Sequence, residues 1–403
     1  MTLAAEALLL LALPLCCASG YLLLLALASR RPGLLPAAPP SLRFDLIVPA
    51  HDEESGIART VQSLLAVDYP AGLRRVLVVA DNCADATAVR AEAAGAQVLV
   101  RDQPGLRGKG YALAHAFEHS LQSGFADAVV VVDADSVVPV NLLHAFAARL
   151  QRGAQAIQAG SAVLNVNDSW RTQLMALGFA LFNGVRSLAR DNLGLSCGLR
   201  GNGMCLSTTT LRAHPPQAFS VVEDIEYGIA LGRAGVRVCY AFEAPVASAM
   251  VSSGMAASSQ RRRWDLGRKQ LARKLAMPLL LEAIERRSAL LYDLGIDLLV
   301  PPLSMLALLI AAGCGAALLL SWLQGAWLPA LWVWLASATG VAVYVARGWA
   351  LSGTGLRGLR AMAFAPFFVV WKLVVLSRGA GRSESSGSAS TEWVRTAREE
   401  APR

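Results

Sequence analysis

The chain has 403 residues, of which 55% are hydrophobic and only 16% are charged. Soluble domains carry about 25% charged residues, so this composition excludes an ordinary soluble protein and predicts that part of the chain lies in lipid. The formal net charge of +8 suits anionic lipids or phosphate-bearing ligands. Nucleic acid is not an expected partner, because the sequence carries neither zinc-finger spacing nor basic–aromatic interleaving.

The first apolar segment, Leu3–Ser29, is long enough to form one membrane helix. A cleaved signal peptide is the competing interpretation, but such a peptide begins with basic residues and has a shorter apolar core. Here Glu6 precedes most of the run and no Lys or Arg does, which favours an uncleaved anchor over residues 1–31. Arg30 and Arg31 follow it and predict that the next domain is cytoplasmic.

Short apolar runs then alternate with amphipathic segments, which predicts a parallel sheet with helices on both faces. The predicted strands are Phe44–Ala50, Arg75–Ala80, Gln97–Val100 and Ala128–Val132. The predicted helices are Gly56–Val67, Ala84–Ala94 and Gly108–Ser123. Ligands of such sheets bind beyond the carboxyl ends of the strands, so the polar residues that follow each strand are the candidates for function.

The pattern is weaker after residue 135 but still predicts elements. These are a helix over Val140–Leu150, a strand over Ala154–Leu164, a helix over Trp170–Arg190, a glycine-rich stretch over Gly194–Gly203 and a basic helix over Ser259–Leu275. Membrane helices are predicted at about Leu298–Leu320 and Ala326–Val345. A third apolar run, Ala361–Leu376, either spans the membrane or lies in its interface.

Asp133-Ala-Asp135 ends the strand of valines. Residues i and i+2 of an extended chain point the same way, so the two carboxylates are expected to converge. Carboxylate oxygens suit Mg²⁺ or Mn²⁺, which bind through a few carboxylates and substrate phosphates. The alternative is a pair of solvated loop aspartates.

Three further polar positions lie near the predicted strand ends. Asp81 ends the second strand, where it either contacts a nucleotide base or ribose or acts as a turn residue. Glu53 follows the first strand, where an acid also suits the dipole of the next helix. Lys109 opens a helix within Arg107-Gly-Lys-Gly110 and faces either a phosphate or solvent.

Two motifs follow later in the chain. Glu223-Asp224 offers a carboxylate that can take a proton from an acceptor hydroxyl, or it is an acidic helix N-terminus. Gln260, Arg263 and Trp264 share one helix face at i, i+3 and i+4. They either bind a sugar and a phosphate or anchor a helix at the membrane interface.

The order of these motifs resembles the membrane-bound branch of glycosyltransferase family 2, which includes cellulose, hyaluronan and poly-N-acetylglucosamine synthases and ceramide glucosyltransferase. The resemblance covers about residues 44–275. It implies nucleotide-sugar binding by Glu53, Asp81, Lys109 and Asp133, metal binding by Asp133 and Asp135, and a base at Asp224. It also implies acceptor or pyrophosphate contacts by Glu223 and by the Gln-x-x-Arg-Trp motif, which contains Gln260, Arg263 and Trp264.

The implied fold is α/β: a GT-A domain, Rossmann-like and nucleotide-sugar-binding, inserted between N-terminal and C-terminal transmembrane helices. Its expected limits are residues 42–275, followed by a membrane region over 276–378 and a polar cytoplasmic tail over 379–403. The implied enzyme is an inverting hexosyltransferase of the inner membrane that uses Mg²⁺ or Mn²⁺. Its donor would be a nucleotide-diphosphate sugar, by resemblance a UDP-sugar, and membrane lipids would surround it.

The acceptor stays open between two alternatives. The first, which the resemblance favours, is a growing polysaccharide, with export proteins as expected partners. The second is a membrane lipid that receives a single sugar. The chain has fewer hydrophobic segments than the polymerising synthases, which argues against a self-sufficient polysaccharide channel. A degenerate, non-enzymatic domain is disfavoured because all the expected carboxylates are present. A transporter is disfavoured because Asp293 and Asp297 lie near the ends of the apolar segments.

Overall fold

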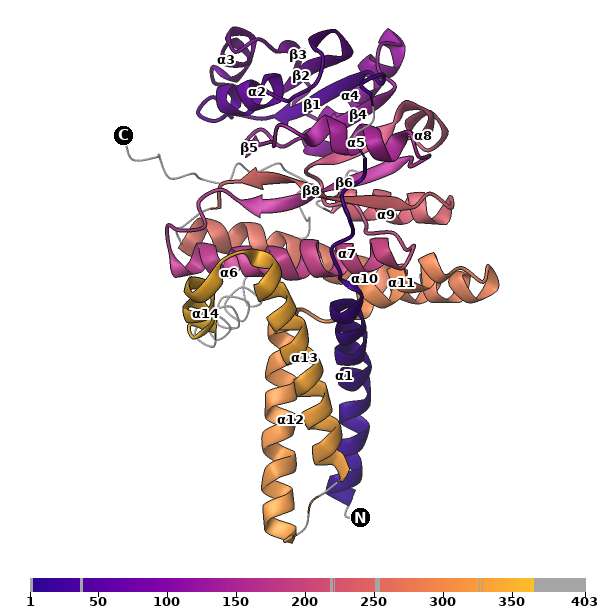
Figure 1. Cartoon of the computed structure of the whole chain (residues 1–403), viewed down its shortest axis with the longest axis vertical. Helices are drawn as coiled ribbons and strands as arrows, with labels where there is room; N and C mark the ends of the chain where they lie inside the picture. The colour runs from indigo at the N-terminus through magenta and orange to yellow at the C-terminus, as the bar shows by residue number, and fades with distance from the viewer. Residues whose placement is uncertain are drawn as a thin grey trace.

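The computed structural model describes residues 3–36, 39–217, 220, 222–250, 254–325, 327 and 329–365, with residues 254–265 described as backbone only. The predicted tail over 379–403 and most of the apolar run 361–376 lie outside the described residues. A sheet domain stands at one end of the molecule and three long helices extend from the other (Figure 1).

Three helices among the described residues are long and apolar enough to cross a membrane: α1 (Leu3–Ala28), α12 (Leu303–Gln324) and α13 (Pro329–Ser352). They lie side by side below the sheet domain (Figure 1). The start of α12 is five residues later than predicted, because Pro301 and Pro302 prevent the helix from extending backwards. The last of them, α13, ends at Ser352, after which Gly353 adopts a left-handed conformation with φ of 68°.

One sheet of eight strands forms the core of the domain in the described residues, in the order β3-β2-β1-β4-β7-β6-β8-β5. The bounds are β1 Phe44–Ala50, β2 Arg74–Asp81, β3 Gln97–Arg101, β4 Ala128–Val131, β5 Ser136–Val137, β6 Ala156–Val163, β7 Met204–Ser207 and β8 Val238–Ser248. The four strands predicted first are parallel, as expected. The rest of the sheet is mixed, because β7 runs antiparallel to both β4 and β6, and β5 runs antiparallel to β8.

Helices cover both faces of this sheet, as the alternating pattern predicted. Leu46 and Val48 of β1 pack on one face in the same core as Ile57, whereas Ile47 points to the opposite core with Leu113. Burial of each such side chain contributes about 1.5–3 kcal/mol. The domain helices are α2 Ile57–Leu65, α3 Thr87–Ala93, α4 Lys109–Ser123, α5 Leu142–Leu150, α8 Thr208–Ala213 and α9 Glu223–Arg233, with a 3₁₀ turn η1 at Ala71–Leu73.

A layer of helices separates the sheet from the three long apolar helices (Figure 1). Its members are α6 Trp170–Phe179, η2 Ala180–Val185, α7 Arg186–Asn192, α10 Gly254–Glu285 and α11 Ala289–Leu299, and α14 (Gly355–Met362) lies beside α6. The helix predicted over 170–190 is therefore present, but a π-helical segment, η2, interrupts it. Segments of this kind occur often at functional sites. The helix α10 continues through residue 275 without a break, so the expected domain boundary there stays a prediction.

Candidate active site

An ammonium group and two acidic groups meet where β4 ends. Lys109, the first residue of α4, places its Nζ atom 2.5 Å from Oδ1 of Asp133 and 2.6 Å from the backbone oxygen of Gly201. A Cβ atom at Gly201 would lie 3.3 Å from Oδ2 of Asp224. Three of the predicted residues, Lys109, Asp133 and Asp224, thus share one site with a glycine loop that sequence analysis singled out only for its composition.

Glu223 and Asp224 occupy the first turn of α9, where acidic side chains suit the helix dipole. Burial raises the pKa of Glu223 to about 7, with the nearby Lys109 opposing the shift and Asp224 adding to it. Burial also raises the pKa of Asp224, and Lys109 again opposes the shift. A buried carboxylate with a raised pKa is suited to accept a proton near neutral pH.

Asn202 fixes the loop that carries Asp133. Its Oδ1 accepts a hydrogen bond of 3.1 Å from the N–H of Asp133, and its Nδ2 donates to Oγ of Ser136 and of Ser248 at 2.8 and 3.1 Å. Gln158 of β6 in turn donates to the backbone oxygen of Asn202 at 2.7 Å. Neither Asn202 nor Gln158 was predicted from the sequence, in which the one signal is the glycine-rich stretch that contains Asn202.

Gly201→Ala is expected to reduce turnover strongly, because the new methyl group would press on Asp224 and lie 3.5 Å from Nζ of Lys109. Gly198→Ala is the matched control, since both glycines have φ of 76° and a Cβ at Gly198 would meet nothing within 4 Å. Both variants therefore carry the same backbone strain. Equal loss of activity in the two variants would show that the effect comes from the backbone and not from the site.

Asp81 lies at the end of β2, completely buried, and its Oδ1 accepts a 2.5 Å hydrogen bond from Nη1 of Arg101. Its Oδ2 is buried without a hydrogen-bond partner among the described residues. An unsatisfied buried carboxylate oxygen is costly, so a ligand that donates a hydrogen bond would stabilise it. No hydrogen bond or ion pair joins Asp81 to Lys109, Asp133 or Asp224 in the described part of the chain, and its predicted role rests on its strand-end position.

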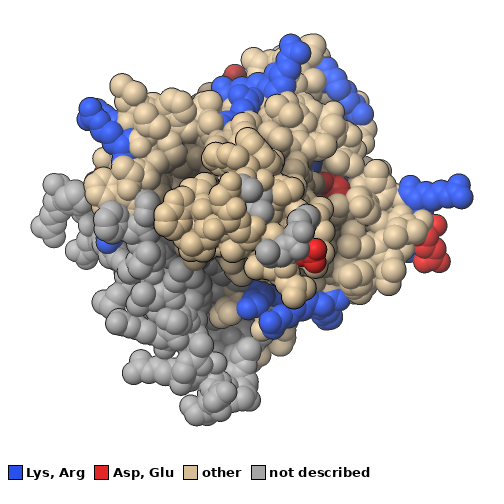
Figure 2. Space-filling view, turned by 90° about the horizontal axis from the view of Figure 1, so that it is seen from below, with Lys and Arg blue, Asp and Glu red and all other residues tan. Residues whose placement is uncertain are grey.

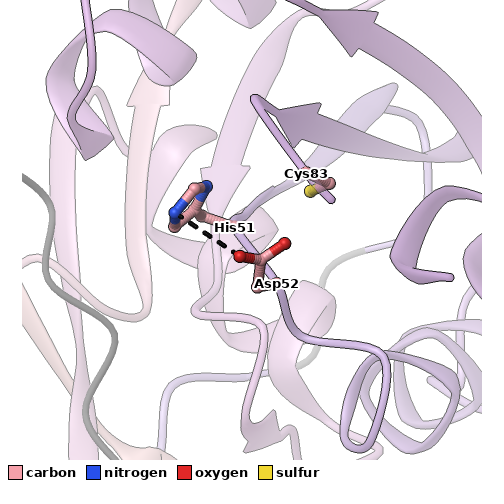
Figure 3. Close-up of side chains that lie close together, drawn as sticks. All are labelled: His51, Asp52 and Cys83. Atoms are coloured by element: carbon pink, nitrogen blue, oxygen red, sulfur yellow. Dashed lines mark ion pairs between the residues drawn. The ribbon is translucent and has the colours of Figure 1, made fainter. Parts of the chain in front are cut away.

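The turn after β1 lies against the end of β2. The N–H of Glu53 donates to Oγ1 of Thr87 at 2.8 Å, which fixes the backbone of Glu53 at the start of α3. His51, Asp52 and Cys83 offer one nitrogen, one oxygen and one sulfur atom within 4.8 Å of one another (Figure 3). Burial raises the pKa of the Cys83 thiol, and a protonated thiol is a poor metal ligand. We interpret the role of these three residues as structural stabilisation of the end of β2. Nδ1 of His51 also forms a hydrogen bond of 2.7 Å with the backbone oxygen of Asp81.

Residues 39–267, more than half of the chain, match the model of the family described as glycosyltransferase like family 2. The chain belongs to this family. Among curated relatives, β-monoglucosyldiacylglycerol synthase of Synechocystis sp. is 28% identical over 231 residues, which cover 55% of this chain and 47% of the relative. The chain therefore spans about half the length of this relative.

Among solved structures, the mannosyltransferase PcManGT from Pyrobaculum calidifontis, in complex with GDP-Man and Mn²⁺, covers 94% of this family 2 chain and 100% of its own. The TM-score is 0.50 and the sequence identity 18%. The likeness at this identity establishes the fold, a GT-A fold between apolar helices, as predicted.

The predicted metal ligands of this family 2 chain, Asp133 and Asp135, lie in a turn and not on an extended strand. The strand β4 ends at Val131, and the N–H of Ser136 closes the turn by donating to the oxygen of Asp133 at 3.1 Å. The expectation of an extended geometry was therefore wrong, and the N–H of Asp133 donates to the Asn202 side chain. The Asp133 side chain is 37% exposed and already holds the Lys109 ammonium, so it is oriented towards a cation.

Asp135 accepts a 3.2 Å hydrogen bond from Oγ of Ser136. The carboxylates of Asp133 and Asp135 are hard oxygen donors and fit the requirements of Mg²⁺ or Mn²⁺.

The Gln-x-x-Arg-Trp residues Gln260, Arg263 and Trp264 lie on α10, where the backbone alone is described. Their predicted contacts stay predictions.

Proposed function

We propose that this chain transfers a single sugar from a nucleotide-diphosphate sugar, by family resemblance a UDP-sugar, to a membrane lipid. The observation that carries the proposal is the meeting of Lys109, Asp133 and Asp224 at a strand end of the sheet, one helix layer away from three apolar helices. A lipid acceptor is preferred to a growing polysaccharide because the curated relative is named a β-monoglucosyldiacylglycerol synthase.

In the proposed reaction, Asp81 and Glu53 hold the nucleoside end of the donor and Lys109 faces its diphosphate. Oδ2 of Asp224 takes the proton from the acceptor hydroxyl as the acceptor oxygen bonds to the anomeric carbon. The bond from that carbon to the diphosphate breaks, and the diphosphate leaves with the electron pair. Attack from the side opposite the leaving group inverts the configuration.

A divalent cation held by Asp133 and Asp135 would supply positive charge against the departing diphosphate. Lys109 contributes a second positive charge from the same place, since its Nζ atom lies 2.5 Å from the Asp133 carboxylate. Fixed charges aimed at the leaving group stabilise the transition state more than the ground state. The site therefore needs both the carboxylate pair and the lysine.

We further propose that the catalytic domain lies on the cytoplasmic side of the inner membrane. Arg30 and Arg31 are exposed immediately after α1, and basic residues beside a span favour the cytoplasmic side. Seen from the end of the long helices, Lys and Arg side chains stand at several places on the described surface and acidic side chains at fewer (Figure 2). Basic side chains in these places also suit the headgroups of anionic lipids.

The test uses the full chain in phosphatidylcholine nanodiscs that contain dioleoylglycerol and phosphatidylglycerol as lipids with a free hydroxyl group, with Mn²⁺ and a panel of radiolabelled UDP- and GDP-sugars. We expect one sugar per labelled lipid, loss of labelling with EDTA and recovery with added Mn²⁺. Asp135→Ala should abolish labelling, whereas Asp68→Ala, whose side chain is 85% exposed, should not. A water-soluble polymer in place of a labelled lipid would contradict the proposal, as would full activity in EDTA.

A further inference from the structure

The helix layer below the active site contains more buried positive than negative charge. Arg190 is 1% exposed as a side chain and pairs with Asp293 at 2.9 Å and Asp297 at 2.8 Å. Arg186 and Arg268 also pair with Asp297, at 2.7 and 3.5 Å. The fourth arginine of the group, Arg200, makes no ion pair within the described residues. Four guanidinium groups thus share two carboxylates, which leaves a surplus of two positive charges. We call these four arginines the arginine cluster.

The π-helical segment η2 gathers three of these arginines around one ring. The guanidinium carbons of Arg200, Arg186 and Arg268 lie 4.2, 5.0 and 5.1 Å from the ring centroid of Phe182. Like charges that converge at a poorly hydrated site repel one another, and an aromatic face offsets only part of that repulsion. A bound anion would offset the remaining repulsion between the guanidinium groups.

Arg200 has the fewest partners of the four arginines among the described residues. Arg190 also donates to the Tyr21 hydroxyl, and Arg186 to the Tyr344 hydroxyl. Arg200, by contrast, donates only to the oxygen of Cys197, at 3.1 Å, and its Nε atom is buried without a partner among the described residues. Burial lowers the pKa of Arg200 to about 10, although Asp297 opposes the shift. Arg268 donates to the backbone oxygen of Asp297 at 2.5 Å, and its side chain is still 20% exposed, so it can reach a ligand from the surface.

Arg200 lies between the active site and the membrane helices. It immediately precedes Gly201, whose backbone oxygen accepts a hydrogen bond of 2.6 Å from Lys109, and the charge of Arg200 opposes the raised pKa of Asp224. On the other side, the backbone of Leu181, next to Phe182, accepts a hydrogen bond of 2.8 Å from the Tyr344 hydroxyl of α13. An anion at Arg200 would therefore lie on the membrane side of the catalytic carboxylate.

We propose that Arg200 and Arg268, backed by Arg186 and Arg190, bind a phosphate group in the headgroup of the lipid acceptor. This inference rests on the proposed function for its acceptor role. A phosphodiester or phosphomonoester carries one or two negative charges, which matches the surplus in the cluster. Guanidinium groups bind phosphate oxygens in bidentate fashion. The diphosphate of the donor is the other source of the same chemistry, and the membrane-side position of the cluster favours the lipid.

Binding measurements distinguish the two possible sources of the phosphate, which are the lipid headgroup and the diphosphate of the donor. Dioctanoyl phosphatidic acid and dioctanoylglycerol, which share their acyl chains, are titrated calorimetrically into the full chain in dodecyl maltoside. We expect the phosphate-bearing lipid to bind at least 10-fold more tightly, and Arg200→Met and Arg268→Met each to remove roughly 10-fold of that affinity. Arg233→Met is the matched control, since Arg233 lies in an ion pair with Glu282 and is 36% exposed. UDP affinity, measured in parallel, should not change.

Several results would overturn the inference. Equal affinity of the wild-type chain for the two lipids would do so without any variant. A parallel loss of UDP affinity in folded Arg200→Met would assign the cluster to the donor diphosphate. The acceptor role is tested with nanodiscs that contain phosphatidylglycerol and dioleoylglycerol in equal amounts: sugar on phosphatidylglycerol supports it, and sugar on dioleoylglycerol alone overturns it. Labelling of neither lipid, with phosphatidic acid still bound, would count against the proposed function and not against the phosphate site.

Discussion

Asp224→Asn is expected to slow sugar transfer by about 10²–10⁴-fold, the usual contribution of a positioned general base. The amide is close to the carboxylate in size and cannot accept the acceptor proton. Oδ2 of Asp224 faces Gly201 beside Lys109, so the change should leave the donor contacts in place. Nucleotide-sugar affinity should therefore change little while kcat falls, and a rate assay with parallel UDP binding measures both.

The control for this variant comes from the same helix turn. Glu226 also lies in the first turn of α9, but its carboxylate accepts a hydrogen bond from Ser220 at 3.0 Å. Glu226→Gln should keep most of the activity. If Asp224→Asn retained more than a tenth of the wild-type rate, Asp224 would not be the base.

The pH profile of kcat gives a second view of the same carboxylate. Burial raises the pKa of Asp224 above its ordinary value, and a base must be deprotonated to act. The rate should therefore fall as the pH decreases through that raised pKa. The positive charges of Lys109 and Arg200 offset part of this rise, since a nearby cation favours the ionised carboxylate. Arg200→Met should therefore shift the acidic limb of the profile to higher pH, and a shift to lower pH would contradict this electrostatic account.

The parallel half of the sheet could be predicted from sequence because its strands are continuous apolar runs. Phe44–Ala50 is buried at every position, and Ala128–Val131 likewise. In the mixed half, β6 (Ala156–Val163) agrees with the strand predicted over Ala154–Leu164, whereas β7 and β8 could not be predicted. The strand β7 has four residues after a glycine-rich loop, and β8 contains Pro245. Neither carries the length or the alternation on which pattern analysis depends.

The acidic and basic residues of the candidate site were predictable as individual positions, because each follows a strand or opens a helix. The residues that hold these side chains in place were not predictable. Asn202 forms hydrogen bonds with Asp133 and Ser248, which lie 69 and 46 residues away from it in the sequence. The arginine cluster shows the same limit. Arg190 lies within a predicted helix and Asp293 near the end of an apolar segment, and only the folded chain joins them.

Arg190→Met is expected to be the most destabilising single change in the helix layer. Removal of one partner from a buried ion pair costs about 3–5 kcal/mol, because the other charge stays buried without compensation. Asp293 would keep the Tyr21 hydroxyl at 2.8 Å as a hydrogen-bond donor but would lose its guanidinium. Arg233→Met removes a half-exposed pair with Glu282 and should cost less than about 1 kcal/mol. Thermal unfolding of the detergent-solubilised chain compares the two.

The double variant Arg190→Met with Asp293→Asn isolates the cause of this loss. The asparagine removes the uncompensated negative charge, and its amide can still accept the hydrogen bond from the Tyr21 hydroxyl. Asp297 retains Arg186 at 2.7 Å in either variant. The double variant should therefore unfold at a higher temperature than Arg190→Met alone. If it unfolded at a lower temperature, the packing of the Arg190 side chain, and not the pairing of its charge, would hold α7 against α11.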